Sequence, residues 1–229
     1  MQTKAAALAA CRPWRLVTPL LLLAFVLAGC AASAQAPQAQ GRAQAPLVIP
    51  EGCDAKQAGL VREAFTLAER QTGQALAFLA ANPTHPHTRT WFGTGSVAKV
   101  EARLRLTQYM LHPSRHPAWT CGTVESCGNR TTFAIANLRQ GLIMLCPPFF
   151  NASNEGGDSR PGILVHEVSH LVAQTNDVAY GQQAARQLAE KDPERAIRNA
   201  DNFEYFVIDD RSLGSNIPGF FSCLFYLII

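Results

Sequence analysis

The chain has 229 residues, of which 48% are hydrophobic and 16% are charged. This length suits one catalytic-sized domain with a hydrophobic core, and the composition excludes a disordered or coiled-coil protein. The formal net charge is +3, but residues 1–29 carry three basic and no acidic side chains, so their removal leaves 3 − 3 = 0. The charge therefore gives no support for a nucleic-acid partner, and no phosphate-binding loop or nucleotide fingerprint is present.

The first 29 residues are typical of a signal peptide. Basic residues precede an apolar run over residues 16–27, which is too short to serve as a permanent membrane span. The run leads into Leu27-Ala28-Gly29-Cys30, which resembles the bacterial lipobox and implies acylation of Cys30. The alternative is cleavage after Ala34-Gln35-Ala36, which would release a soluble protein. We favour the lipid anchor and expect an exported protein, either an outer-membrane or periplasmic lipoprotein or an extracellular one.

Composition also predicts the segments on either side of the folded domain. Residues 30–52 are mostly Ala, Gln and Pro, cannot bury enough apolar surface to fold, and are expected to form a flexible tether. The folded domain is expected to span residues 53–210. The apolar tail, residues 211–229, is too short to span a membrane and receives no predicted role.

The sequence contains seven cysteines. Cys11 lies in the leader, Cys30 in the lipobox and Cys223 in the tail. The remaining four lie in the expected domain, and in an exported protein they are expected to form disulfides rather than thiolate metal sites. Spacing alone leaves all three pairings open for the four domain cysteines, which are Cys53, Cys121, Cys127 and Cys146.

The domain is expected to begin with two helices. Apolar residues recur at helical spacing from Ala55 to Ala81, and a second pattern runs from about Ser96 to Leu111, with a Pro- and His-rich loop between them. Short β-type runs follow, and helical patterns return after Pro161. The runs are Ala118 to Gly122, Thr131 to Ala136 and Leu142 to Leu145, and the later helices are Pro161 to Leu171, Ala179 to Glu190 and Glu194 to Val207. This order predicts an α+β fold, mainly helical with a small β-sheet.

The chemistry is concentrated in His166-Glu167-Val168-Ser169-His170. Residues four apart lie on one face of a helix, so both imidazoles can bind one Zn²⁺ while Glu167 stands beside a metal-bound water. Zinc lowers the pKa of such a water, and a neighbouring carboxylate can take its proton and pass it to the leaving amine. We therefore expect an HExxH active-site helix, one zinc ion and peptide-bond hydrolysis.

A catalytic zinc needs a third protein ligand. A histidine six residues after His170 is absent, because Asn176 stands there, and this excludes the metzincin pattern. Glu190, twenty residues downstream, is one candidate. Asp177 is nearer and lies where a helix can end, turn and present a carboxylate back to the metal.

At this point the chain resembles the deuterolysin and peptidyl-lysine metallopeptidase family, the aspzincins. Asp177-Val178-Ala179-Tyr180-Gly181 matches the second half of the family segment Gly-Thr-x-x-Asp-x-x-Tyr-Gly, although Gln174 stands in place of the glycine. The likeness extends over roughly residues 53–208, through Thr90 to Thr94, the four domain cysteines and Asn199 to Phe206. It implies a zincin-like metallopeptidase domain.

The resemblance also implies a role for each matching residue. Zinc would be bound by His166, His170 and Asp177, Glu167 would act as general base and acid, and Tyr180 would donate to the developing oxyanion. The cysteine pairs would be Cys53 with Cys121 and Cys127 with Cys146.

Asp201 and Glu204 match acidic residues of the lysine-specific branch of that family. At i, i+3 they can face one pocket and offer two negative charges to a substrate cation, which predicts cleavage on the N-terminal side of lysine. The alternative is a solvated pair tied to Arg195 or Arg198.

The expected partners are protein or peptide substrates. We expect a monomer that binds no nucleic acid and contacts a membrane only through Cys30. A non-catalytic surface lipoprotein and a zinc amidase acting on cell-wall peptides are the competing functions.

Overall fold

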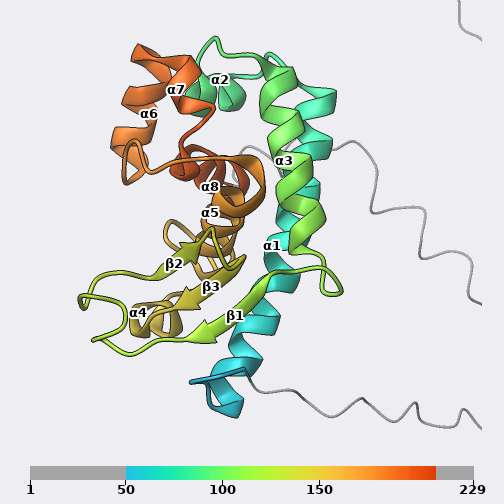
Figure 1. Ribbon diagram of the computed structural model, residues 1–229. Coiled ribbons are helices and arrows are strands. Elements are labelled where there is room, and N and C mark those ends of the chain that lie inside the picture. The colour runs from blue at the N-terminus through green and yellow to red at the C-terminus, as the bar shows by residue number, and fades with distance from the viewer. Residues whose placement is uncertain (1–49, 210–229) are drawn as a thin grey trace, which may run out of the picture. The chain divides into compact units, whose positions relative to one another are not determined.

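The computed structural model describes residues 50–209 (Figure 1). The predicted signal peptide, the lipobox cysteine Cys30, most of the tether and the apolar tail with Cys223 lie outside the described residues. Among residues 50–209, no helix has the length and apolar character needed to cross a membrane.

Two long helices form one side of the fold and run side by side (Figure 1). Helix α1 spans Ala55–Ala81 and begins with a capping box, in which the Asp54 carboxylate accepts from the Gln57 N–H at 2.7 Å and the Gln57 side chain accepts from the Asp54 N–H. Helix α3 spans Val97–Leu111. Both helices were predicted from apolar periodicity, and both are confirmed to within one residue.

The segment predicted as a Pro- and His-rich loop contains a helix. Helix α2 spans Pro86–Phe92 and buries Trp91 and Phe92. Proline is compatible with the first turn of a helix, because the N–H that it lacks would have no partner there. Helix α4, Pro147–Asn151, starts with proline in the same way and was also not predicted.

The strands form one small mixed sheet, as predicted. Strands β1 (Ala118–Cys121), β2 (Ala134–Asn137) and β3 (Leu142–Leu145) are arranged in the order β1-β3-β2. Strand β3 pairs parallel with β1 and antiparallel with β2. Strand β2 is therefore an edge strand, and it lies against α5 (Figure 1).

Two disulfides fix the sheet to its surroundings. Cys53, just before α1, bonds to Cys121 at the end of β1. Cys127, in the loop after β1, bonds to Cys146 at the end of β3. This is the pairing implied by the family resemblance, chosen from the three that spacing left open.

Helix α5, Arg160–Ala173, lies at the centre of the fold and packs against α1, α3 and α8. Three shorter helices follow: α6 (Gln182–Lys191), α7 (Pro193–Ala196) and α8 (Ala200–Ile208).

Two of the predicted helix ranges were wrong in detail. The range Glu194 to Val207 is interrupted, because Asn199 is extended and pairs with Asn176 in an isolated β-bridge. The helix expected to start at Ala179 starts only at Gln182, as α6, because Gly181 has a φ of 81°, which is incompatible with a helix.

Candidate metal centre and adjoining pockets

Helix α5 carries His166, Glu167 and His170. The helix is well defined at its start, where Ser159 accepts from the Gly162 N–H and a proline occupies the first turn. The two imidazoles lie one turn apart on the same face, with ring centroids 4.8 Å apart. The spacing that was read from the sequence as a metal-binding pair is thus realised on one helix.

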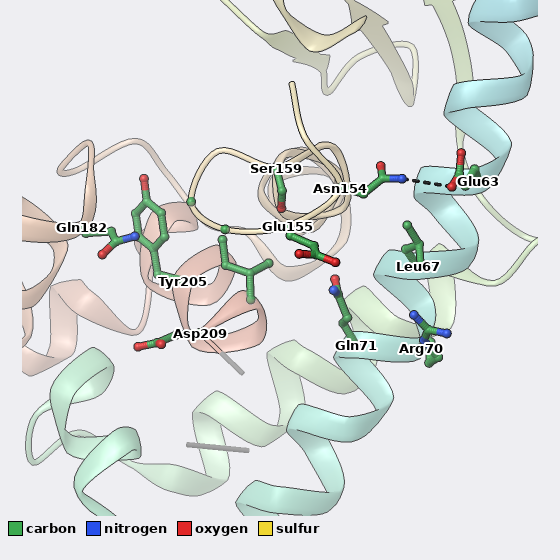
Figure 2. A pocket seen from close by; sticks show the side chains of 13 residues that line it. Glu63, Leu67, Arg70, Gln71, Asn154, Glu155, Ser159, Gln182, Tyr205 and Asp209 are labelled. Atoms are coloured by element: carbon green, nitrogen blue, oxygen red, sulfur yellow. Dashed lines mark hydrogen bonds between the residues drawn. The ribbon is translucent and has the colours of Figure 1, made fainter. Parts of the chain in front are cut away.

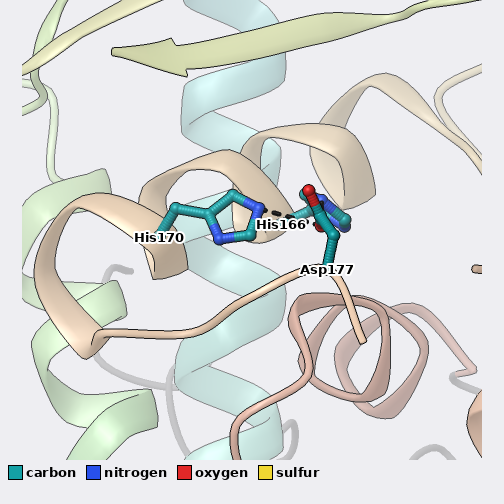
Figure 3. A group of neighbouring side chains, drawn as sticks. All are labelled: His166, His170 and Asp177. Carbon is teal, nitrogen blue, oxygen red and sulfur yellow. Dashed lines mark ion pairs between the residues drawn. The ribbon is translucent and has the colours of Figure 1, made fainter. Parts of the chain in front are cut away.

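Asp177 reaches both histidines from the segment after α5 (Figure 3). Its Oδ1 lies 3.0 Å from His166 Nε2 and 3.1 Å from His170 Nε2. Ligand atoms that share one tetrahedral zinc at bond lengths of about 2.0–2.2 Å are separated by about 3.3 Å. The three side chains can therefore hold one metal ion. Glu190, the other residue considered as third ligand from the sequence, lines a different pocket together with Arg89.

The electrostatics of the three groups match this geometry. Burial would raise the pKa of Asp177, but its hydrogen bonds with both histidines lower that pKa well below the usual value. Burial acts in the opposite direction on the histidines, whose pKa values are nevertheless raised by the neighbouring carboxylate. The site is thus organised around attraction between imidazole and carboxylate.

The segment that carries Asp177 turns back at Gln174. This residue ends α5 with φ 55° and ψ 42°, the left-handed conformation that glycine adopts most readily. Gln174 stands where the family resemblance leads us to expect glycine, and its left-handed backbone makes the turn. The turn at Gln174 thus brings Asp177 back to the histidines.

Asn199 then holds the segment against the start of α8. Its Oδ1 accepts from the backbone N–H groups of Val178 and Ala179 at 2.8 and 3.0 Å, and its Nδ2 donates to the Ala179 carbonyl and to Asn202. Asn199 is fully buried, so these contacts are shielded from water. The residue belongs to the motif noted in the sequence, but its role in placing the metal-binding segment was not predicted.

His170 is oriented from its other nitrogen. Its Nδ1 lies 3.0 Å from the Thr175 carbonyl, so a proton on Nδ1 leaves Nε2 for a metal. The Thr175 hydroxyl contacts the Ser169 hydroxyl at 2.7 Å, which ties the turn to α5.

His166 is oriented by the acidic pair predicted to bind substrate. Its Nδ1 lies 2.8 Å from Asp201 Oδ1 and 3.6 Å from Glu204 Oε2. The second oxygen of Asp201 accepts from the Gly181 N–H. Asp201 therefore connects α5 to the end of the metal-binding segment. Both carboxylates are buried, and within residues 50–209 neither forms an ion pair with Arg195 or Arg198. The alternative prediction, a solvated pair tied to one of these arginines, is therefore wrong.

Glu204 differs from Asp201 in having an unused acceptor. The residue is 3% exposed, and its Oε1 has no hydrogen-bond partner among the described residues. A Cβ at Gly162 would lie 2.9 Å from that oxygen, so the glycine provides its space. Burial raises the pKa of Glu204 to about 7, and the nearby Asp201 and Asp158 carboxylates add to the shift.

Glu167 and Tyr180 lie where two pockets adjoin. Both line two adjoining pockets of about 420 and 520 Å³ that also share Asp177. Glu167 is 7% exposed, and burial raises the pKa of its carboxyl group. Tyr180 is 68% exposed, and partial burial together with a hydrogen bond to Asp177 raises its pKa to about 12.

The two pockets differ in character. The first, the β2 pocket, runs along strand β2 and includes the exposed side chains of Ile135 and Leu138. The second, the acidic pocket, contains Asp201 and Glu204 and a further carboxylate, Asp158, which was not predicted from the sequence.

A third pocket, of about 560 Å³, lies between α1 and the loop before α5 (Figure 2). Its lining mixes charges, including Glu63, Arg70 and Glu155. No metal-binding group of histidine, cysteine or carboxylate side chains is found in it among residues 50–209. It is therefore a weaker candidate for chemistry than the cleft at α5.

Comparisons with known proteins agree with this site. The family Aspzincin_M35, described as lysine-specific metallo-endopeptidase, matches residues 77–208. The peptidyl-Lys metalloendopeptidase of Pleurotus ostreatus is 33% identical over 168 residues, which cover 71% of this chain and 97% of that protein. The solved zinc peptidase from Grifola frondosa superposes with a TM-score of 0.59 at 32% identity, covering 69% of this chain and 98% of the other.

Two longer relatives match only in part. The peptidyl-Lys metalloendopeptidase of Grifola frondosa is 34% identical over 69% of this chain and 46% of its own length. An extracellular protease of Aeromonas hydrophila is 34% identical over a match that covers 68% of this chain and 45% of that protein. The chain thus spans about half the length of these two relatives. The match over residues 77–208 and the near-complete coverage of the Pleurotus protein show that this chain belongs to the aspzincin family of metallo-endopeptidases.

Proposed function

We propose that this chain is a zinc endopeptidase that hydrolyses the peptide bond on the N-terminal side of lysine. The observation that carries the proposal is the convergence of His166, His170 and Asp177, whose ligand atoms all lie within 4.8 Å of one another. The catalytic candidate Glu167 and an acidic pocket lie beside this point. Membership of a lysine-specific metallo-endopeptidase family supports the same activity.

The donor set fits one zinc ion. Two imidazole nitrogens and one carboxylate oxygen are ligands that zinc accepts, and three protein ligands are the usual number in catalytic zinc sites. When bound there, zinc supplies a Lewis acid that polarises the scissile carbonyl and acidifies a water molecule. Asp201 would keep the His166 ring in place through its Nδ1.

Glu167 is assigned the proton transfers. Its carboxylate accepts a proton from the attacking water and then delivers it to the leaving amine. Its position supports this role, because it lines both pockets and so lies where the two halves of a bound peptide meet. The backbone of Ala136 on β2 donates to the carboxylate and helps to fix it.

Tyr180 is assigned the stabilisation of the oxyanion. Its phenol is exposed at the cleft and, with a pKa of about 12, keeps its proton at neutral pH. It can therefore donate a hydrogen bond to a carbonyl oxygen on which negative charge develops.

The two pockets suggest how a peptide lies in the cleft. The acidic pocket would receive the lysine that follows the scissile bond, because its carboxylates attract an ammonium group. Residues before the scissile bond would lie along the edge strand β2, whose unpaired edge can bind an extended peptide. Ile135 and Leu138 would then contact apolar side chains of the substrate.

The site is proposed to act outside the cytoplasm. Two disulfides fit an oxidising compartment. A relative that matches over 68% of this chain is described as an extracellular protease. Acylation at Cys30 and a monomeric state remain part of the proposal.

Digestion of a peptide library tests the activity, with mass-spectrometric mapping of the cuts. We expect cleavage before lysine that is lost on chelation and in Glu167→Ala, while Glu167→Ala still binds one equivalent of zinc. A non-catalytic binding module would show no turnover in the wild type or in Glu167→Ala. Release of peptides from peptidoglycan fragments without cleavage of casein would indicate a cell-wall amidase instead, and either outcome would overturn the proposed function.

A further inference from the structure

Three carboxylates of the acidic pocket come from two separate parts of the chain. Asp201 and Glu204 come from α8, whereas Asp158 comes from the loop before α5. The lining contains these three carboxylates together with Glu167 and Asp177, and it contains no lysine or arginine. A pocket of this composition favours a cation.

The α8 carboxylates are not equally available to that cation. Both oxygens of Asp201 are engaged, one by His166 Nδ1 at 2.8 Å and the other by the Gly181 N–H. Glu204, in contrast, is 97% buried and has an oxygen, Oε1, without a hydrogen-bond partner in the described structure. A buried carboxylate oxygen without a partner is costly unless a ligand satisfies it.

Asp158 lines the same pocket and is held in place. Its backbone adopts φ 54°, one of only two non-glycine residues with positive φ in the described part of the chain. The hydroxyl of Tyr205, a buried neighbour of Glu204, donates to Asp158 Oδ1 at 3.0 Å. This bond leaves Oδ2 available, and the side chain is exposed to solvent.

We propose that Asp158 is a specificity-determining residue, which binds the ε-ammonium group of the substrate lysine together with Glu204. An ammonium group has three N–H donors and is best satisfied by several acceptors from different directions. Glu204 supplies a buried acceptor and Asp158 an exposed one. Asp201 is a positioning residue, which acts on substrate through His166. This inference rests on the proposed lysine-directed function.

The charge of Asp158 can be removed without removing its structural contacts. Asparagine adopts positive φ readily, and its side-chain oxygen can still accept from Tyr205. Asp158→Asn therefore tests the charge alone. The matched control is Glu155→Gln, which removes one carboxylate from the same loop but faces the pocket against α1 (Figure 2).

The experiment compares two peptides that differ only in having lysine or norleucine after the scissile bond. Zinc-loaded wild type, Asp158→Asn and Glu155→Gln are assayed for kcat and KM. We expect Asp158→Asn to lower the lysine-to-norleucine ratio of kcat/KM by about tenfold, mainly through KM for the lysine peptide. Glu155→Gln should leave that ratio at the wild-type value.

Two results would overturn the assignment, and they differ in what else they affect. A wild-type ratio in Asp158→Asn, with equal losses on both peptides, would mean that the residue is structural. That result would leave the proposed function intact. A wild-type enzyme that cleaves both peptides equally would overturn lysine specificity and the assignment of Asp158 with it.

Discussion

Helix α5 and the segment after it, residues 174–181, both contribute side chains to the candidate metal centre, but different interactions place them. The two histidines follow from the period of a helix that is buried over most of its length. Asp177 lies in a segment without regular structure, and distant residues hold that segment in place. The comparison shows that helical spacing positions two of the candidate ligands, whereas tertiary contacts position the third.

Removal of Asp177 should have the largest effect on this arrangement. In Asp177→Ala, two imidazoles remain without their shared carboxylate, so we expect activity to fall by about a thousandfold or more and zinc to be lost on dialysis. Zinc content by atomic absorption and peptidase assay measure both effects. Glu190→Ala is the control and should retain zinc and activity. The reverse pattern would make Glu190 the ligand.

Tyr180→Phe should have the next largest effect. Loss of the phenol should lower kcat by about a hundredfold while zinc content stays unchanged, because the hydroxyl is assigned to the oxyanion rather than to the metal. With its pKa raised to about 12, the phenol remains protonated as pH rises through the neutral range. The activity ratio of wild type to variant should therefore be constant from about pH 6 to 9. A ratio that falls towards 1 at the alkaline end would contradict the role.

Asn199→Ala tests the tertiary anchor of the segment without touching a ligand. It removes the partners of two backbone N–H groups and one carbonyl, so we expect the unfolding free energy to fall by about 3 kcal/mol. Zinc affinity should fall by about 10- to 100-fold, because Asp177 is held less firmly. Urea unfolding of the metal-free protein and zinc titration separate the two effects. Unchanged zinc affinity in a destabilised variant would show that the segment places Asp177 without this anchor.

Gln174→Gly addresses the smallest effect, the cost of the left-handed turn at the end of α5. A non-glycine residue in this conformation costs about 1–2 kcal/mol, which is partly offset by the greater backbone entropy of glycine in the unfolded chain. We expect the variant to be more stable by up to about 1 kcal/mol with unchanged zinc affinity. Calorimetry provides the measurement, and a decrease in stability would show that the glutamine side chain stabilises the turn.

The sequence predicted the parts of the molecule that depend on neighbouring residues. The long helices α1 and α3, the three strands and the helical placement of His166 and His170 all follow from periodicity. The short helices that begin with proline were missed, because their few residues give too little periodicity to outweigh a loop signal.

The acidic residues of the cleft depended on tertiary structure. Asp201 and Glu204 were selected as a pair, but only the fold turned the first towards His166 and Gly181 and left the second with an unused oxygen. Asp158 gave no signal in the sequence, because its role depends on contact with Tyr205, 47 residues away. Helical spacing is encoded over one turn of chain, whereas a pocket wall is assembled from segments whose approach only the packed core determines.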